Sequence, residues 1–492
     1  MALNKLNELT LLNWNCNGIE KQFDYLSHFI RSNKIDIACI TETHLRPSSK
    51  CNLKIPGYVS YRNDRICDKA TGGVAIIIHR RIAHCCLNTP SSEKLETIGI
   101  KLTQSYQQDV HIIAAYRPPN KPFPTDILKQ ILFLKNPIII SGELNAKHKT
   151  WGCNVTTLQG KKLLQIATEK ACAINALTAP TFYPAHINVK PDILDLTLTK
   201  NIKLPIIQRP QPELNSDHSP VIITFNINKT PVTQRQRIIT GKINWQKFRE
   251  QLSHQLSVPR NLTNNTRIEI EIENFTSAIH SAIKNSQTPV AKFNFQNCQI
   301  PNKILKMIAT KRQLRRKWQR LRLPHFKNQI NNLGHQINQA LEKNRFKFFQ
   351  KTISQISPAS KDQWTTIRHL TKEKTYIPVL KLKNSEAITD CEKARAFAKY
   401  FSSTFTLNNA HDTEFTAKVE NEINEKWYTA ELPIKFISPK EITNQIKRLP
   451  PKTSSGHDQI PNCVIKELPH QAISVLTAIF NACFRLGYFP QQ

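Results

Sequence analysis

Short apolar runs separated by polar loops recur along residues 8–227. Several runs are continuous stretches of Ile, Val and Leu, which is typical of strands buried on both faces of a sheet. The predicted strands are Leu9–Trp14, Ile35–Thr41, Gly73–His79, Thr97–Leu102, Val110–Ala115, Pro137–Ser141, Ile193–Thr199 and Val221–Phe225. Helical spacing of apolar residues falls at 20–33, 122–135 and 158–175. Strands that alternate with helices predict a layered α/β domain over residues 8–227.

The pattern changes after residue 228. The stretch Lys229–Arg237 is polar and basic, and the residues beyond it have the apolar spacing of helices. We therefore expect a basic helical region over 228–359. Residues 360–492 are also predicted to be helical, with proline breaks, and Ser438 is expected to cap a helix.

The charge of the chain favours a polyanionic partner. Lys and Arg number 69 against 36 Asp and Glu, a formal net charge of +33. Nucleic acid is the usual partner of such a chain, and an anionic membrane surface is the alternative. No apolar run approaches the ~20 residues that span a bilayer. The 12 cysteines include no CxxC pair, which favours reduced thiols and an intracellular protein.

One segment concentrates the basic residues. Residues 303–351 contain 14 Lys and Arg but a single acid, Glu342. A charge run is often only a solvated helix face, yet like charges without acidic partners repel one another. We therefore favour nucleic-acid binding by this segment. The residues expected to contact phosphates are Lys311, Arg312, Arg315, Arg316 and Lys317.

Polar residues capable of phosphodiester chemistry follow or begin several predicted strands. In layered α/β folds such groups gather at one sheet edge, so distant residues are expected to share a pocket. The residues concerned are Asn15, Glu42, Tyr116, Glu143, Asn145, Asp195, Asp217 and His218.

The residue types suit cleavage of a phosphate ester. Oxygen ligands suit Mg²⁺, so Glu42 and Asp217, with the Asn15 amide, are candidate metal ligands. An imidazole titrates near neutrality, which makes His218 the candidate base. Asp195 is the candidate partner of its other ring nitrogen.

Two neutral residues complete this set, and each member also has a simpler explanation. Asn145 and Tyr116 are donors able to hold phosphate oxygens. Taken singly, Asn15 fits a turn former, Glu42 a solvated charge and His218 a structural histidine. The joint pattern therefore carries the interpretation.

These motifs resemble a known family. The segments that carry the resemblance are Leu12–Gly18 (LNWNCNG), Thr41–His44 (TETH), Tyr116–Pro118 (YRP), Gly142–Asn145 (GELN) and Ser216–Pro220 (SDHSP). In this order they are similar to the endonuclease/exonuclease/phosphatase family, which includes apurinic endonucleases. The segments Ser141–Cys153 and Pro191–Leu198 resemble more closely the endonuclease of jockey-type non-LTR retrotransposons.

The resemblance implies a four-layer α/β sandwich and metal-dependent DNA nicking with Mg²⁺ or Mn²⁺, without a small-molecule cofactor. It implies metal binding by Glu42 with Asn15 and Asp217. It also implies phosphate contacts from Tyr116 and Asn145.

For the remaining residues, the resemblance implies that His218, oriented by Asp195, handles water and the developing charge. Thr181 and Ser216 match positions that support the phosphate site. The implied partners are target DNA and element RNA, with no membrane, and the implied location is the nucleus.

Glu143 departs from the family pattern, which has Asp at this position. The extra methylene moves the carboxylate by roughly 1 Å, and misplacement on that scale costs about 10²-fold in rate. We therefore predict impaired nicking, recoverable by Glu143→Asp.

The last third resembles the beginning of a retroelement reverse transcriptase. Lys452–Pro461 (KTSSGHDQIP) is similar to the Lys-x-x-Pro-Gly-x-Asp-x-Ile motif, with Ser455 in place of proline. No Tyr-x-Asp-Asp box occurs, so we expect a truncated polymerase region over 360–492.

The leading hypothesis is thus a retrotransposon endonuclease whose nick primes reverse transcription. The alternatives are a catalytically impaired nucleic-acid-binding relic and a phosphatase of the same fold acting on small esters. The high positive charge disfavours a small substrate.

Overall fold

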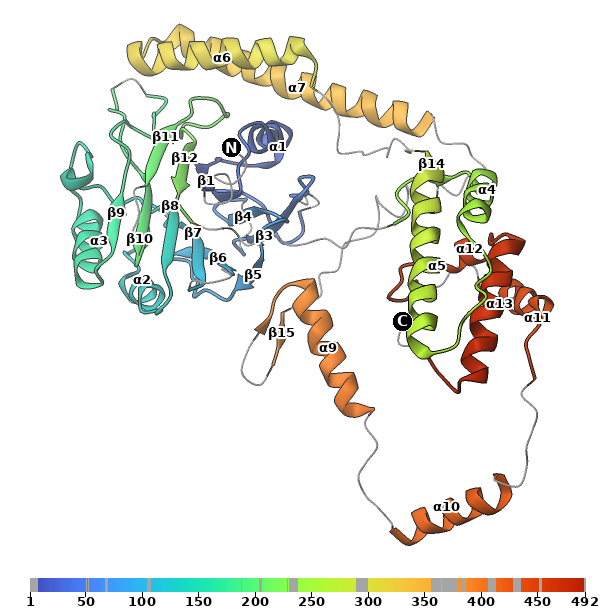
Figure 1. Ribbon diagram of the computed structural model, residues 1–492. Coiled ribbons are helices and arrows are strands. Elements are labelled where there is room, and N and C mark those ends of the chain that lie inside the picture. The colour runs from blue at the N-terminus through green and yellow to red at the C-terminus, as the bar shows by residue number, and fades with distance from the viewer. Residues whose placement is uncertain are drawn as a thin grey trace. The chain divides into compact units, whose positions relative to one another are not determined.

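A computed structural model describes residues 8–49, 51, 53–66, 70–103, 108–186, 188–202, 206–227, 229, 238–288, 300–354, 364, 379–382, 386–405, 413–427, 435–450 and 454–490. The chain forms two compact units (Figure 1). The first, the α/β unit, combines Met1–Thr233 with Asn294–Phe405. The second, the helical unit, combines Gln234–Phe293 with Thr406–Gln492.

The strands of the α/β unit are β1 (Leu9–Asn15), β2 (Ile37–Thr41), β3 (Tyr58–Asn63), β4 (Val74–His79), β5 (His84–Leu87), β6 (Glu96–Leu102), β7 (Val110–Tyr116), β8 (Ile138–Glu143), β9 (Ala173–Asn175), β10 (Asp195–Lys200), β11 (Ile207–Pro210), β12 (Val221–Phe225), β15 (Leu380–Lys381) and β16 (Glu386–Ala387). Its helices are α1 (Phe23–Ser32), α2 (Thr125–Leu132), α3 (Leu158–Glu169), α6 (Asn302–Leu321), α7 (Pro324–Ser354) and α9 (Asp390–Thr404), with short 3-10 turns at Glu20–Gln22 and Lys149–Trp151.

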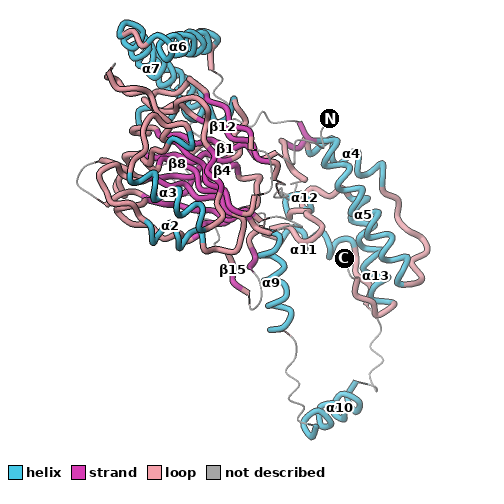
Figure 2. Tube along the Cα trace, turned by 90° about the vertical axis from the view of Figure 1, so that its left-hand side faces the viewer, coloured by secondary structure: helices cyan, strands magenta, loops and turns pink. Residues whose placement is uncertain are grey.

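Two six-stranded sheets form the centre of the α/β unit. The first has the order β11-β12-β1-β2-β4-β3, and the second has the order β5-β6-β7-β8-β10-β9. In each sheet one central pair is parallel, β1 with β2 and β7 with β8, and the other neighbours are antiparallel. Figure 2 shows these strands at the centre of the unit, with α2 and α3 outside them.

Alternation along the strands makes the layers. Leu9 and Leu11 of β1 enter the apolar core that both sheets share, whereas Leu12 and Trp14 enter a second core. Successive strand side chains point to opposite faces, so one strand serves two cores. In β8, Ile139 lies between the sheets, and its neighbours pack against α2 and α3. The expected four-layer sandwich is thereby confirmed.

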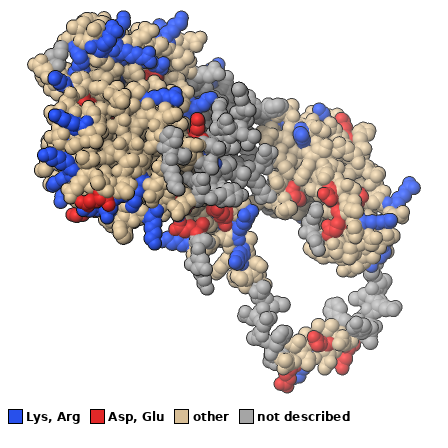
Figure 3. Space-filling model, turned by 60° about the vertical axis from the view of Figure 1, so that its left-hand side comes forward, with Lys and Arg blue, Asp and Glu red and all other residues tan. Residues whose placement is uncertain are grey.

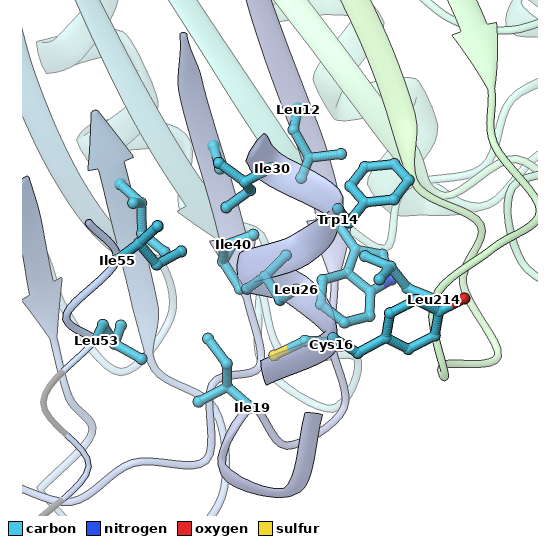
Figure 4. Close-up of a cluster of buried hydrophobic side chains, with 14 of the residues drawn as sticks. Leu12, Trp14, Cys16, Ile19, Leu26, Ile30, Ile40, Leu53, Ile55 and Leu214 are labelled. Atoms are coloured by element: carbon cyan, nitrogen blue, oxygen red, sulfur yellow. The ribbon is translucent and has the colours of Figure 1, made fainter. Parts of the chain in front are cut away.

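The second core lies under α1 (Figure 4). Leu26 and Ile30 of this helix pack with Leu12, Trp14 and Ile40 of the sheet. The same core contains Ile304 and Ile308 of α6 and Ile337 and Leu341 of α7. The α6–α7 hairpin is therefore part of the α/β unit and covers an outer face of its sheet.

Every strand predicted over 8–227 is present, and four further strands, β3, β5, β9 and β11, were not predicted. All four lie at the edges of the two sheets. Edge strands are short and carry polar residues on their exposed positions, so they lack a continuous apolar run.

The helical unit contains β13 (Lys242–Ile243), α4 (Trp245–Gln255), α5 (Asn265–Ser286), β14 (Gln287–Thr288), α10 (Thr413–Trp427), α11 (Pro439–Arg448), α12 (Asn462–Ile465) and α13 (His470–Arg485). Phe248, Phe275 and Ile279 share one core with Val475 and Ile479.

The two units divide the chain differently from the expected domains. The regions expected at 228–359 and 360–492 are each split, because α4 and α5 share their core with α12 and α13. The predicted cap is confirmed, since Ser438 and Glu441 form a capping box at the start of α11. The stretch 230–237 and residues 452–453 of the polymerase-like motif lie outside the described residues.

Candidate nuclease site

Both sheets deliver polar residues to one place at their strand ends. Asn15 ends β1 and is paired in register with Thr41, directly before Glu42. In the other sheet, Tyr116 at the end of β7 is paired with Glu143 at the end of β8. Glu143 is in turn opposite Asp195, the first residue of β10. The expectation that distant strand ends converge is therefore met in the structure.

His218 lies at the centre of this cluster. Its Nδ1 is 2.8 Å from Oδ2 of Asp195, and its Nε2 is 3.9 Å from Oε2 of Glu143. The Phe182 ring packs against the imidazole, with the ring centroids 4.9 Å apart. Burial lowers the pKa of His218, but the negative charges of Asp195 and Glu143 outweigh this effect and raise the pKa to about 10. The imidazole is accordingly protonated at neutral pH.

Glu143 connects the two sheets. Its Oε2 accepts a hydrogen bond from Nδ2 of Asn15, which belongs to the opposite sheet. The side chain is buried, and this burial raises the pKa of Glu143 to about 7, although the charge of His218 acts in the other direction. A carboxylate with a raised pKa is a stronger base than an ordinary glutamate.

Glu42 is a partly accessible carboxylate of the cluster, with 21% of its side chain exposed. Its Oε2 lies 3.5 Å from Nε2 of His44. Burial raises the pKa of Glu42, but hydrogen bonds from His44, Tyr116 and Asn15 outweigh it and lower the pKa. A carboxylate that stays ionised and partly open to solvent is a suitable ligand for a hard cation.

The backbone is strained at this end of the sheets. Glu42, His44 and Asn145 have φ angles of 51°, 53° and 48°, in the left-handed region. Such conformations cost of order 1–3 kcal/mol each and cluster at functional sites. The fold thus holds these side chains in positions that local preference alone would not select.

Asn145 is held by Arg117, a residue to which the sequence reasoning gave no role. Asn145 Nδ2 donates to the Arg117 carbonyl at 2.9 Å, and Arg117 Nη2 donates back to the Asn145 carbonyl at 2.9 Å. The buried guanidinium also donates to the carbonyls of Leu144 and Lys121. The only feature of the sequence that pointed to a role for Arg117 was its position directly after Tyr116.

Thr181 and Ser216 support the site through the backbone. Thr181 Oγ1 accepts the amide hydrogens of Leu194 and Asp195 at 3.1 and 3.2 Å. Ser216 Oγ accepts the His218 amide hydrogen and donates to Oδ1 of Asp217, both at 3.1 Å. These two residues thus orient Asp195 and the Asp217–His218 pair from behind.

The evidence for a metal site is the presence of suitable oxygen donors, and not a preformed cluster of ligands. Among the described residues, no group of three or more His, Cys, Asp and Glu is arranged to hold a metal ion. Yet Glu42 is an ionised oxygen ligand beside the Asn15 amide. Within the same described part of the chain, Asp195 Oδ1 is buried without a hydrogen-bond partner, which a water or cation would relieve. The donor set therefore fits a hard divalent cation.

The five basic residues expected to bind phosphate differ in position. Arg316 and Lys317 are exposed, and Arg312 forms an ion pair with Glu213. Lys311 and Arg315 are buried. The reason is helical period: these two residues lie on the same face of α6 as Ile304, Ile308 and Trp318, which are also buried. Of the five residues expected to contact phosphate, only Arg316 and Lys317 are thus exposed on the outer face of α6.

Known proteins resemble this chain in sequence. Residues 110–222 match the endonuclease-reverse transcriptase family. The chain is 28% identical over 498 residues to the probable RNA-directed DNA polymerase from transposon X-element of Drosophila melanogaster, covering 98% of this chain and 54% of that protein. It is 27% identical to the RNA-directed DNA polymerase from mobile element jockey of the same organism, covering 97% of this chain and 53% of that protein.

The resemblance to jockey-type retrotransposon proteins is confirmed. Residues 110–222 of the α/β unit are thus similar to an endonuclease-reverse transcriptase domain, and the chain as a whole is similar to RNA-directed DNA polymerases of mobile elements. The chain spans about half the length of the curated relatives that it matches.

Among solved structures, the endonuclease domain of TRAS1, a telomere-specific non-LTR retrotransposon, is 18% identical to this chain. The alignment covers 45% of this chain and 100% of that one, with a TM-score of 0.39. None of the helices in the described ranges is long and apolar enough to span a bilayer.

Proposed function

We propose that this chain is a divalent-cation-dependent endonuclease that nicks DNA. The main support is a series of side-chain interactions that joins both sheets at one buried site. It runs from Asp195 to His218, then to Glu143 and to Asn15. A histidine oriented by one carboxylate and facing a second is an arrangement able to move a proton and stabilise charge.

The pKa values suggest which side chain donates a proton and which one accepts it. His218 is held protonated by its two carboxylate neighbours, so it suits donation to a phosphate oxygen as negative charge develops. Glu143, with a pKa raised to about 7, suits removal of a proton from the attacking water. This assignment differs from the expectation that His218 is the base. That expectation used the ordinary pKa of imidazole, which Asp195 and Glu143 change.

The cation would be held by Glu42, with the Asn15 amide and Asp217 as its further oxygen ligands. A bound Mg²⁺ or Mn²⁺ neutralises charge on the phosphate ester. Tyr116 and Asn145 are the remaining phosphate contacts in this proposal, and Arg117 fixes Asn145 for that task.

We propose that DNA is the substrate and that an element RNA is a second partner. Figure 3 shows more Lys and Arg than Asp and Glu on the visible face of the α/β unit. The exposed residues Arg316 and Lys317 of α6 are the candidate phosphate contacts outside the cleavage site. Chromosomal DNA as substrate implies action in the nucleus, where the nick would prime reverse transcription.

The test is a supercoiled plasmid incubated with the full chain and Mg²⁺, with EDTA as the paired control. Nicked circles that form only with the cation, and that disappear with His218→Ala, support the proposal. Salt-sensitive DNA binding without nicking, in both the chain and its Glu143→Asp variant, would instead identify a catalytically inactive binding protein. Turnover of a small phosphate ester without nicking would identify a phosphatase.

A further inference from the structure

The loop that carries the catalytic histidine is covered by a helix from far along the chain. Residues 213–219, here the histidine loop, connect β11 to β12 and include Asp217 and His218. Their backbone carbonyls face α6, which follows about a hundred residues later and lies with α7 alongside α1 (Figure 1). The histidine loop is thus held between the sheet and this helix.

Arg315 makes the densest set of these contacts. Its Nη1 donates to the Leu214 carbonyl, and its Nη2 donates to the carbonyls of Ser216 at 2.8 Å and His218 at 3.1 Å. The planar fork of a guanidinium matches several acceptors at fixed angles. One side chain therefore ties together three alternate positions of the loop backbone, including that of the histidine.

Lys311 secures the start of the loop. Its Nζ donates to the Glu213 carbonyl at 2.9 Å and to Oδ1 of Asn215, and it lies 4.7 Å from the Tyr25 ring centroid. At the other end of the loop, Gln319 Nε2 donates to Ser219 Oγ at 2.9 Å. The helix therefore contacts the histidine loop along its whole length.

Stability alone does not explain these buried cations. Lys311 and Arg315 are 0% and 3% exposed, and neither forms an ion pair with an acid in the described part of the chain. Burial lowers the pKa of both groups, which reflects the cost of removing their charge from water. Apolar side chains of similar volume at these positions would avoid that cost. What the cations provide instead is fixed geometry of loop carbonyls.

We propose that α6 is a positioning element of the nuclease site, in which Arg315, assisted by Lys311, fixes the histidine loop and so the ring of His218 against Asp195 and Glu143. Its catalytic consequence rests on the proposed endonuclease function. A displacement of the ring by about 1 Å would separate Nδ1 from Asp195 and cost about 10²-fold in rate. The position of the histidine loop accordingly depends on residues that lie outside 8–227.

The experiment compares Arg315→Met and Arg315→Lys with Arg345→Met in the full chain. Arg345 also joins the hairpin to the rest of the α/β unit, through Asp24 of helix α1 at 3.0 Å, and no hydrogen bond joins it to the described residues of the histidine loop. Arg315→Met and Arg345→Met each remove one guanidinium, so the formal charge of the chain changes by the same amount in both variants. Arg315→Lys keeps the charge and the fold-compatible length but not the fork.

Two readouts are measured on each variant. Hydrogen exchange follows amides of the histidine loop, such as that of Ser219, which donates to the Thr181 carbonyl at 2.7 Å. The single-turnover nicking rate at saturating DNA is measured in whichever of the chain and its Glu143→Asp variant is faster. We expect both Arg315 variants to accelerate exchange in residues 213–219, and Arg315→Met to lower the rate by about 10²-fold. We expect Arg345→Met to change neither readout.

The outcomes separate this proposal from the endonuclease proposal. Faster loop exchange confined to the Arg315 variants supports positioning even when no form of the chain nicks DNA, in which case it is the endonuclease proposal that fails. Unchanged exchange in Arg315→Lys and Arg315→Met overturns the positioning role. Faster exchange with an unchanged nicking rate overturns it as well, because the loop would then be mobile without consequence.

Discussion

Glu143 Oε2 lies 3.9 Å from Nε2 of His218, the ring nitrogen that faces away from Asp195. The same oxygen accepts the hydrogen bond from Asn15. The carboxylate is therefore engaged on both sides, and its position depends on the length of a glutamate side chain.

Shortening this side chain is expected to increase nicking. Glu143→Asp draws the carboxylate back by about 1 Å, toward the position typical of the resembling family, and the expected gain is about 10²-fold in plasmid nicking. Glu143→Gln keeps the length without the basic oxygen and is expected to show no gain. The same substitution at an exposed position, Glu169→Asp, serves as the control. Equal activity of the chain and Glu143→Asp would contradict the prediction.

Removing the imidazole is expected to abolish most of the activity. His218→Ala should lower the nicking rate by about 10²–10⁴-fold, the usual range for loss of a proton-handling group. Asp195→Asn should also lower the nicking rate, because the His218 ring loses the carboxylate that orients it. The measurement is single-turnover nicking in the more active background.

A matched control exists for the histidine variant. His111→Gln alters another buried histidine, at the opposite end of β7 from Tyr116. Nicking by His111→Gln should equal that of the parent chain. An equal loss in His111→Gln and His218→Ala would show that the effect comes from the fold and not from the site.

Loss of the Glu42 carboxylate is expected to weaken binding of the cation and so to lower the nicking activity. Glu42→Gln keeps the shape but not the charge that binds a hard cation, and nicking should fall by about 10²-fold, which corresponds to roughly 2.7 kcal/mol. Chelation by EDTA should have the same effect on the parent chain and be reversed by Mg²⁺. Glu93→Gln, on the surface beside Lys121, is the control. Full activity of Glu42→Gln in Mg²⁺ would exclude Glu42 as a ligand.

Stability should fall as pH rises through neutrality. The folded-state pKa of His218, about 10, exceeds the ordinary value of 6.5. The stabilisation from its protonated ring is fully present below pH 6.5 and is lost as pH rises toward 10, with a slope of at most about 1.4 kcal/mol per pH unit. Between pH 7 and 8.5, in EDTA, the free energy of opening of β1 and β2 should therefore decline. Urea-dependent hydrogen exchange measures it.

The His218→Gln variant provides the comparison for this pH dependence. It should show a smaller decline than the parent chain over the same interval, whatever its absolute stability. Parallel slopes for the two proteins would mean that His218 titrates with its ordinary pKa.

The exposed face of α6 should contribute to DNA affinity through charge. Arg316→Ala and Lys317→Ala are each expected to weaken binding uniformly across sequences and to reduce the slope of log affinity against log salt by about 1. Lys247→Ala, on an exposed position of α4, should leave the slope unchanged. Identical slopes for all three variants would remove α6 from the DNA contact.

Much of the sandwich and of its site was predictable from the sequence. Continuous apolar runs identify the central strands because those strands are buried on both faces, and the residues at their ends follow from where each run stops. Asn15, Glu42, Glu143 and His218 could therefore be expected to share a pocket before any contact was known, although the structure draws them from two sheets and not from one sheet edge. The edge strands β3, β5, β9 and β11 lack such runs, which is why pattern alone missed them.

Only the tertiary structure decided which side of α6 is buried and what its cations do. A run of Lys and Arg has the same sequence signature whether it faces water, DNA or backbone carbonyls, since each of these satisfies a positive charge. Lys311 and Arg315 meet carbonyls of a loop about a hundred residues earlier, a pairing that no local pattern encodes. The pKa values of Glu143 and His218 belong to the same class, because burial and neighbouring charge exist only once the two sheets have packed.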